Sequence, residues 1–307
     1  MKKPLKKIMM VDSSGAFTRL FYFLFIILVQ PFTPVKAQQE TDSINRKRVR
    51  TIIATSTIGY TGSMVALSEV WYSDFDKQSF RFFDDSKEWN QLDKLGHFYS
   101  TFQVSAFGSR SLQWAGLTKK KSDKIAAISS FFVISSIELF DGRSSGYGAS
   151  VSDLAANAIG ATLYLGQQAL WGETRIIPKF SFHQTYFAAL RPDVLGGNLG
   201  EEIIKDYNGQ TYWLSTDVDK FTRFPKWLNI ALGYGSHNMI YADNNSNVQN
   251  GIEPYRQYYI GLDFDLSGIH TRSKLVKGLL YVANLVKLPA PTLEFYQGKV
   301  KAHAFYF

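Results

Sequence analysis

The chain has 307 residues, of which 45% are hydrophobic and 20% are charged, and it contains no cysteine. This composition excludes a disordered chain and an extended array of membrane-spanning helices. The lack of cysteine excludes disulfides, thiolate metal sites, a cysteine nucleophile and a lipid anchor on an N-terminal cysteine. We therefore expect one large domain or two ordinary ones that depend on packing for their stability.

The N-terminal segment is typical of a secretory signal peptide. Lysines at its start precede an unbroken apolar run from Leu20 to Val29, which is short for a membrane-spanning helix. The small-residue pattern Val35-Lys36-Ala37 then offers a cleavage site. We predict a signal peptide at residues 1–37, with an uncleaved anchor as the alternative. The protein is then exported to the periplasm, where it is either free or associated with the outer membrane.

Most of the positive charge belongs to this segment. The whole chain carries a net charge of +8, and residues 1–37 contain six basic residues and one acidic residue, so the remainder carries +3. A net charge this small gives no electrostatic footprint of nucleic-acid binding. We predict no nucleic-acid partner and expect contact with a membrane or another envelope component.

Four helical segments are predicted in the first half, and they are joined by polar or glycine-rich connections. Their ranges are 51–72, 92–114, 122–140 and 151–171. The first has Glu69 as its single charged residue and is rich in Thr, Ser and Gly, which favour close helix packing. We predict a buried helix there, with a membrane-embedded helix as the alternative.

After Pro178 the apolar period changes from helical to alternating, which indicates strands. The predicted strands are 180–190, 227–234 and 255–266, followed by two strands around the turn Gln297-Gly298. Between them we predict a short helix at 199–208, an Asn-rich loop at 242–251, and a basic amphipathic helix at 273–288. The last suits either a membrane interface or the core.

The predicted fold class is therefore α+β, with an N-terminal four-helix bundle followed by a β-rich, mainly antiparallel half. We expect a helical domain at residues 38–175, carrying the polar motif described next, and a β-rich domain at residues 176–307.

Polar residues recur at helical spacing within the bundle. In an antiparallel bundle, the start of the second helix, the end of the third and the start of the fourth lie at the same end. The residues expected to converge there are Asp93, His97, Glu138, Asp141, Asp153 and Asn157. Carboxylates beside an imidazole suit general acid/base chemistry or a hard-metal site.

The same residues also have structural explanations. Asp93 fits the first turn of a helix capped by Asn90, and Ser150 with Asp153 fits a capping box. Asp141 could close a turn and Asn157 could satisfy a buried backbone group. Glu138 needs a partner, because an unpaired buried charge costs several kcal/mol. Such a partner is available in Lys94, Arg143 or His97, so a buried ion-pair network is an alternative to a chemical site.

Three short motifs carry a resemblance to a known family. They are Asp93-Lys94-x-Gly96-His97, then Glu138 with Asp141-Gly142, then Ser152-Asp153-x-x-Ala156-Asn157-x-x-Gly160. Together they resemble an uncharacterised family of predicted periplasmic lipoproteins of the YfiM type, over residues 93–171. They are more faintly similar to VanZ-like membrane proteins. The stretch from Lys205 to Ser215 resembles the longer, Bacteroidetes-type members. The resemblance implies no established activity.

Three functional hypotheses follow. The first is an envelope protein whose polar cluster is structural or binds a ligand through Asp93, Lys94, Asp141 and Asn157. The second is an envelope hydrolase acting on a lipid or cell-wall precursor, with His97 as general base and with Glu138 and Asp153 orienting it or holding a metal. The third is an integral-membrane bundle of the VanZ-like kind. The sequence assigns neither a metal nor a cofactor.

Overall fold

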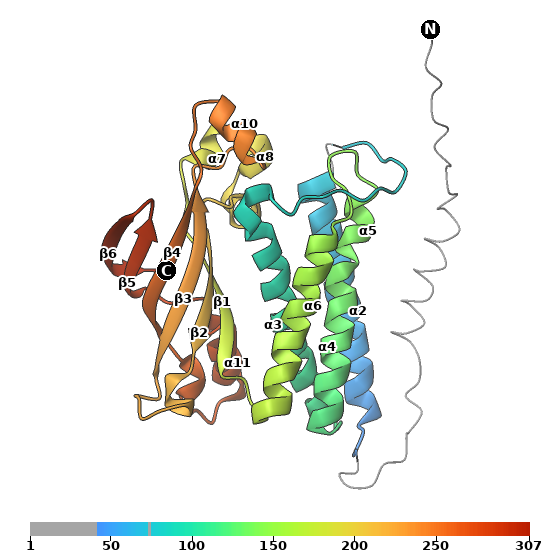
Figure 1. The fold of residues 1–307 in the computed structure, drawn as a ribbon. Helices are drawn as coiled ribbons and strands as arrows, with labels where there is room; N and C mark the ends of the chain where they lie inside the picture. Colours follow the sequence, from blue (N-terminus) through green and yellow to red (C-terminus); the bar gives the residue numbers. More distant parts are fainter. Residues whose placement is uncertain (1–41, 73–74) are drawn as a thin grey trace.

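The computed structural model describes residues 42–72 and 75–307, so the predicted signal peptide lies outside the described residues. Helices form the first half of the chain, and an antiparallel sheet dominates the second half (Figure 1). The predicted α+β fold class is confirmed.

The long helices match the predicted ones closely. They are α2 (Arg46–Leu67), α3 (Leu92–Trp114), α4 (Lys119–Ser135) with the short α5 (Ile137–Asp141), and α6 (Val151–Trp171). A π-helical turn, Ser68–Tyr72, extends α2, and a 3₁₀ turn, Glu88–Gln91, precedes α3. The shorter helices α7 (Phe187–Leu190), α8 (Pro192–Leu195), α9 (Leu199–Lys205), α10 (Asn244–Gln249) and α11 (Lys274–Ala283) lie among and beside the strands.

Helices α3, α4 and α6 pack against one another around a small core. Phe102, Ala127, Ala161 and Tyr164 form its buried centre, with the rings of Phe102 and Tyr164 meeting edge to face. Small residues at the contacts let the helix backbones approach closely. Burial of this apolar surface fixes how the three helices lie against each other.

Helix α2 is not buried, so that prediction was wrong. None of its residues is buried, and Ile58 is 72% exposed. Its threonine hydroxyls bond to carbonyls of their own helix, as Thr55 does to Thr51. Its first turns carry the basic residues Arg46, Lys47, Arg48 and Arg50, and the threonine hydroxyls that follow are satisfied within the helix itself. Two contacts join the helix to the rest of the bundle: near its start the Arg48 guanidinium donates to the Trp114 carbonyl, and in its second half Tyr60 bonds to Ser136.

Within the described ranges, none of the helices combines the length and the apolar character that crossing a membrane requires. The integral-membrane alternative receives no support from this finding.

The sheet in the described chain has six strands in sequential order, each antiparallel to the next. The strands are β1 (Ile176–Phe182), β2 (Gln210–Thr216), β3 (Leu228–His237), β4 (Tyr255–Phe264), β5 (Ala290–Tyr296) and β6 (Lys299–Tyr306). One face packs around Trp213, Ala231 and Tyr259, with Tyr306 of β6 stacked on Tyr259. The same face buries an ion pair between Lys179 and Asp263, at 2.7 Å.

Four of the five predicted strands are confirmed, and the structure differs from the prediction at three other places. The strand predicted over 180–190 ends at Phe182, and Phe187 begins a short helix whose aromatic side chain is buried. Strand β2 was missed, because its Tyr, Trp, Ser and Thr mixture gives no clear alternation. The predicted Asn-rich loop contains α10, which is capped by Asp243.

The two halves are in contact along α3. The Tyr99 ring lies near the rings of Phe180 and Tyr212, and Gln103 donates to the Pro178 carbonyl at 2.5 Å. Figure 1 shows β1 and β2 beside α3, with β5 and β6 at the far edge. The sheet therefore covers one flank of the helices and reaches the end of α3 that carries the polar motif.

Candidate functional site

The site begins at an unusual turn into α3. Trp89, Asn90 and Gln91 all have positive φ values, which non-glycine residues rarely adopt. The expected cap by Asn90 is wrong: Gln91 is the capping residue and its side chain makes no bond to the first turn of the helix, while the Asn90 amide donates to Ser236 in β3. Asp93 in the first turn is therefore not part of a capping box, and its carboxylate is available to the site.

The start of α6 uses half of the predicted capping box. The Ser150 hydroxyl accepts from the Asp153 backbone N–H at 3.0 Å, as predicted. The reciprocal bond comes from another helix, because the Ser150 N–H donates to Glu138 Oε2 at 2.7 Å. Glu138 thus replaces Asp153 at the cap, and the Asp153 carboxylate turns into the bundle instead.

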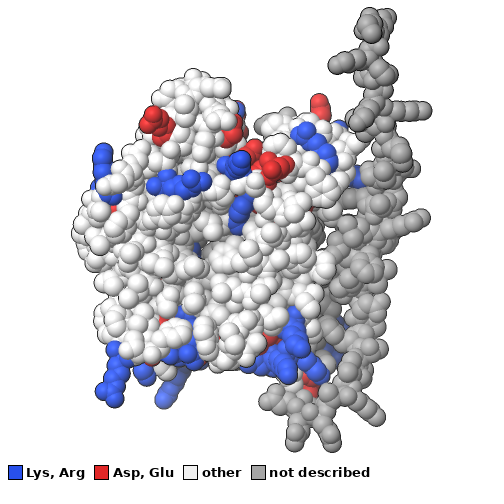
Figure 2. Space-filling view, viewed as in Figure 1, with Lys and Arg blue, Asp and Glu red and all other residues white. Residues whose placement is uncertain are grey.

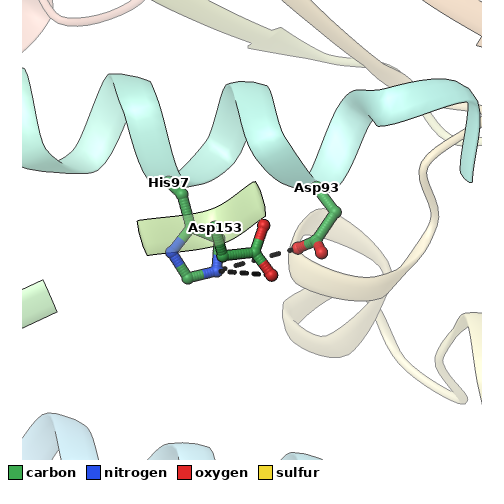
Figure 3. Close-up of side chains that lie close together, drawn as sticks. All are labelled: Asp93, His97 and Asp153. Atoms are coloured by element: carbon green, nitrogen blue, oxygen red, sulfur yellow. Dashed lines mark ion pairs between the residues drawn. The ribbon is translucent and has the colours of Figure 1, made fainter. Parts of the chain in front are cut away.

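His97 lies at the centre of the group. Its Nδ1 is 3.2 Å from Asn157 Oδ1, which also accepts from the Thr101 hydroxyl. An amide oxygen only accepts, so Nδ1 carries the proton and, in the neutral ring, Nε2 carries a lone pair. Nε2 lies 3.9 Å from Asp93 Oδ1 and 4.0 Å from Asp153 Oδ2 (Figure 3). It also lies 3.8 Å from Glu138 Oε1.

Each of these three carboxylates uses its two oxygens differently. Asp93 Oδ2 and Asp153 Oδ1 each lie 3.0 Å from Lys94 Nζ, and Glu138 Oε2 accepts from Ser150. The remaining oxygen of each carboxylate faces the imidazole Nε2. Among the described residues, Glu138 Oε1 is buried without a hydrogen-bond partner, and the Glu138 residue is 3% exposed.

Lys94 and Asp85 form an outer layer around this centre. Lys94 Nζ donates to Asp85 Oδ2 at 2.5 Å, and Asp85 Oδ1 accepts from the Ser150 and Ser152 hydroxyls. Burial by itself lowers the Lys94 pKa, but Asp93, Asp153 and Asp85 together raise it above its usual value. Lys94 is therefore a fixed ammonium that orients carboxylates.

Burial dominates the ionisation of the inner carboxylates. It raises the pKa of Glu138 to about 9 and the pKa of Asp153 to about 6, and neighbouring carboxylates add to both shifts. Several buried acids therefore face one ammonium and one imidazole. This arrangement favours either bound protons or a further positive charge between the acids.

Asp141 lies to one side of the group. Its carboxylate accepts from the Tyr72 hydroxyl at 2.7 Å, and burial raises the Asp141 pKa to about 7. Asn157 lies on the opposite side of the His97 ring from the carboxylates. The structure thus brings together Asp93, Lys94, His97, Glu138, Asp153 and Asn157, with Asp141 at the edge.

Two residues of the site were not predicted from the sequence. Asp85 lies in a polar connection with no periodicity, so nothing in its neighbourhood marks it. Tyr207 comes from the C-terminal half, and its hydroxyl donates to Asp93 Oδ1 at 3.3 Å. Tyr207 belongs to the stretch from Lys205 to Ser215 that carries part of the resemblance, which was the one available signal.

The spacing of the α6 motif has a direct packing reason. An added Cβ at Gly160 would overlap the Phe98 carbonyl oxygen of α3. Because Gly160 lacks that atom, α6 lies close enough for Asn157, one turn earlier, to reach His97. The ligand atoms of Asp93, His97 and Asp153 lie within 4.8 Å of one another, on α3 and α6 (Figure 3).

A family model matches residues 80–166, a segment that contains Asp85 and all of the inner residues of the cluster. No curated protein and no solved structure matches the chain. The finer resemblances to YfiM-type and VanZ-like proteins are not confirmed and stay predictions. The predicted periplasmic localisation agrees with the description of the matched family. The helical segment from residue 80 to residue 166 thus matches the family described as "Predicted periplasmic lipoprotein (DUF2279)".

Proposed function

We propose that this periplasmic protein binds a divalent cation between His97 and the carboxylates of Asp93, Glu138 and Asp153. The observation that supports the proposal most strongly is the orphan Glu138 Oε1, which is buried and faces His97 Nε2 at 3.8 Å. A buried, unpaired carboxylate oxygen aimed at an imidazole lone pair is stabilised by a bound proton or by a positive partner, and 3.8 Å is too long for a proton to bridge the two atoms.

The separations suit one shared ion. Zinc-like ions bind nitrogen and oxygen ligands at about 2.0–2.2 Å, so two atoms on opposite sides of the ion lie up to about 4.3 Å apart. The three Nε2–oxygen distances run from 3.8 to 4.0 Å. They are too long for hydrogen bonds and fit a bridging cation. One imidazole with several carboxylates suits Zn²⁺ or Mn²⁺.

The residues around the proposed cation position hold the ligand side chains in their orientations. Asn157 holds the imidazole proton on Nδ1, which leaves Nε2 available to a cation. Lys94 and the Ser150 N–H each hold a carboxylate oxygen that a cation does not use. Asp93 is the most exposed of the four, with 27% of its side chain accessible, so it marks the side open to solvent.

Isothermal titration of chelator-treated protein with Mn²⁺ and with Zn²⁺ tests the proposal. The wild type is expected to bind one equivalent of at least one of these ions, and Glu138→Gln and His97→Gln to bind at least ten-fold more weakly. The matched control is Asp123→Asn, which alters a buried carboxylate at the other end of α4, bonded to Ser109 and Tyr164. Equal heats in all four proteins, or no binding to the wild type, would overturn the proposal.

The main alternative is a structural cluster in which His97 is an imidazolium ion held by the three acids. This alternative predicts a folded protein whose melting temperature does not respond to divalent cations. Its test is a thermal melt with and without chelator, in which a cation-dependent rise excludes a purely structural role.

A second candidate function is the envelope hydrolase acting on a lipid or cell-wall precursor. The observation in its favour is the open side at Asp93, through which a substrate group could approach His97 Nε2. In this candidate Asn157 orients the imidazole, and Glu138 and Asp153 hold the metal. The test is hydrolysis of a lipid-linked diphosphate: His97→Ala must abolish it without changing the melting profile. If wild-type protein loaded with Mn²⁺ or Zn²⁺ does not hydrolyse this substrate, the hydrolase candidate is ruled out.

A further inference from the structure

A second surface of the molecule lies at the end away from the polar site, where two loops and α11 come together. One loop, residues 217–227, joins β2 to β3, and the other, residues 265–273, joins β4 to α11. The Asp265 N–H donates to the Trp227 carbonyl at 3.0 Å, so the two loops are fixed to each other. Figure 2 shows Lys and Arg side chains gathered at this lower end, beneath a broad uncharged band.

Large apolar side chains project from the two loops. Phe221 is 52% exposed, Trp227 is 57% exposed and Ile269 is 50% exposed. Exposed apolar residues that occur singly are ordinary, but three of them on adjoining loops beside an apolar helix face form a patch. Trp in such a setting is typical of the boundary between membrane and water.

Helix α11 turns its apolar face outward. Leu275, Leu279 and Val282 are spaced four and three residues apart on one face and are 73%, 60% and 60% exposed. The opposite side of the helix is used for packing, since Tyr281 lies under the Arg110 guanidinium and Asn284 is buried. The sequence left open whether the helix predicted at 273–288 lies at a membrane interface or in the core. In the structure its apolar stripe is exposed.

Basic side chains surround this apolar patch. Arg223, Lys226, Arg272 and Lys277 are exposed, and none of them forms an ion pair within the described part of the chain. Among the neighbouring acids, Glu173 pairs with Lys220 and Arg175, Asp217 and Asp265 are buried, and only Asp219 is partly exposed without an ion pair in the described chain. The unbalanced charge at this surface is therefore positive.

The helical half continues the basic surface. Exposed basic residues crowd the start of α2 and the start of α4, at Arg46, Lys47, Lys120 and Lys124. The Arg48 guanidinium lies over the Trp114 ring, which joins the start of α2 to the end of α3. Arg110 in turn joins the end of α3 to α11.

We propose that this end of the molecule docks on an anionic phospholipid surface. Arg223, Lys226, Arg272 and Lys277 would meet the lipid phosphates, and the apolar loop tips and the α11 stripe would enter the headgroup region. A second copy of the chain is a poorer occupant, because a two-fold interface would place the same basic side chains opposite each other. The proposal is independent of the cation site, which lies at the other end of α3.

Vesicle cosedimentation of the full chain tests this proposal. The protein is expected to pellet with vesicles containing phosphatidylglycerol, to bind pure phosphatidylcholine at least ten-fold more weakly, and to be released by salt. Lys226→Glu with Lys277→Glu is expected to weaken binding to phosphatidylglycerol by at least roughly 25-fold, since each basic residue near an anionic surface contributes about five-fold.

The matched control is Lys299→Glu with Lys301→Glu, which makes the same charge change on exposed positions of β6. It is expected to bind within about three-fold of the wild type, because β6 lies at the far edge of the sheet. Leu275→Ser with Leu279→Ser tests the apolar part and is expected to leave binding that moderate salt abolishes. Equal losses in both lysine pairs, equal binding to the two lipids, or a dimer in solution that the leucine pair dissociates would overturn the proposal.

Discussion

Asn157 Oδ1 lies 3.2 Å from His97 Nδ1 and thereby determines which ring nitrogen faces the carboxylates. The contact joins α6 to α3, and Asn157 is fully buried. Because the amide oxygen holds the ring proton, the nitrogen that faces Asp93, Glu138 and Asp153 is free to accept a cation.

Replacing the Asn157 amide tests whether its contact orients the His97 ring for cation binding. Asn157→Ala is expected to weaken cation binding by about 10- to 100-fold, the usual effect of losing a group that orients a ligand. Isothermal titration measures it. Gln167→Ala is the control, since Gln167 is a buried amide on the same helix that accepts from Arg175 and Ile176. Both variants lose stability, and only Asn157→Ala should lose affinity. Equal affinities would refute the orienting role.

The close approach of α6 to α3 leads to a prediction about protein stability, and a second glycine on α6 provides the control. Gly160→Ala is expected to destabilise the protein by about 1–3 kcal/mol, because the new methyl group overlaps the Phe98 carbonyl. Gly166→Ala lies on the same helix with open space around its Cβ, so it is expected to stabilise by up to about 1 kcal/mol. Urea denaturation measures both, and effects of the same sign would contradict the packing argument.

Much of this site followed from sequence, and the reasons are local. Helical spacing places Asp93 with His97 and Asp153 with Asn157 on shared faces, and the antiparallel order of the helices brings their ends together. Capping rules failed at Asn90 because its amide bonds to Ser236, which is 146 residues away along the chain. The contact of Tyr207 with Asp93 also depends on tertiary structure. So does the bond at the start of α6, where Glu138 takes the place predicted for Asp153. No local pattern encodes such partners.

The raised pKa of Glu138 gives a pH prediction with a definite sign. The carboxyl ionises near 4.5 when unperturbed and near 9 in the fold. Its contribution to stability is therefore complete below pH 4.5 and is lost as the pH rises toward 9. Asp153 changes in the same direction, with a folded pKa of about 6.

Thermal melts of cation-free protein between pH 5 and 9 measure this effect. The melting temperature of the wild type is expected to fall more steeply with pH than that of Glu138→Gln, which keeps the shape and cannot ionise. Adding Mn²⁺ is expected to raise the wild-type melting temperature more at pH 8 than at pH 6. Parallel pH profiles for the two proteins would show that Glu138 does not carry the shift.

The buried ion pair in the sheet gives a prediction that does not involve the site. Lys179 and Asp263 are both fully buried and lie 2.7 Å apart. Asp263→Leu alone is expected to cost about 3–5 kcal/mol, because it leaves a buried ammonium ion without its counter-ion. The double variant Lys179→Met with Asp263→Leu is expected to cost less than the single one. Denaturant titration compares them, and a double variant that costs the sum of both single variants would contradict the coupling.

The most direct test of the cation site is an anomalous-difference map from a crystal of the protein grown with Mn²⁺ or Zn²⁺. One strong peak is expected about 2.0–2.2 Å from His97 Nε2 and from carboxylate oxygens of Asp93, Glu138 and Asp153. A map without a peak at His97, with a direct hydrogen bond between His97 Nε2 and a carboxylate in its place, would contradict it. The cluster would then be a structural ion-pair network.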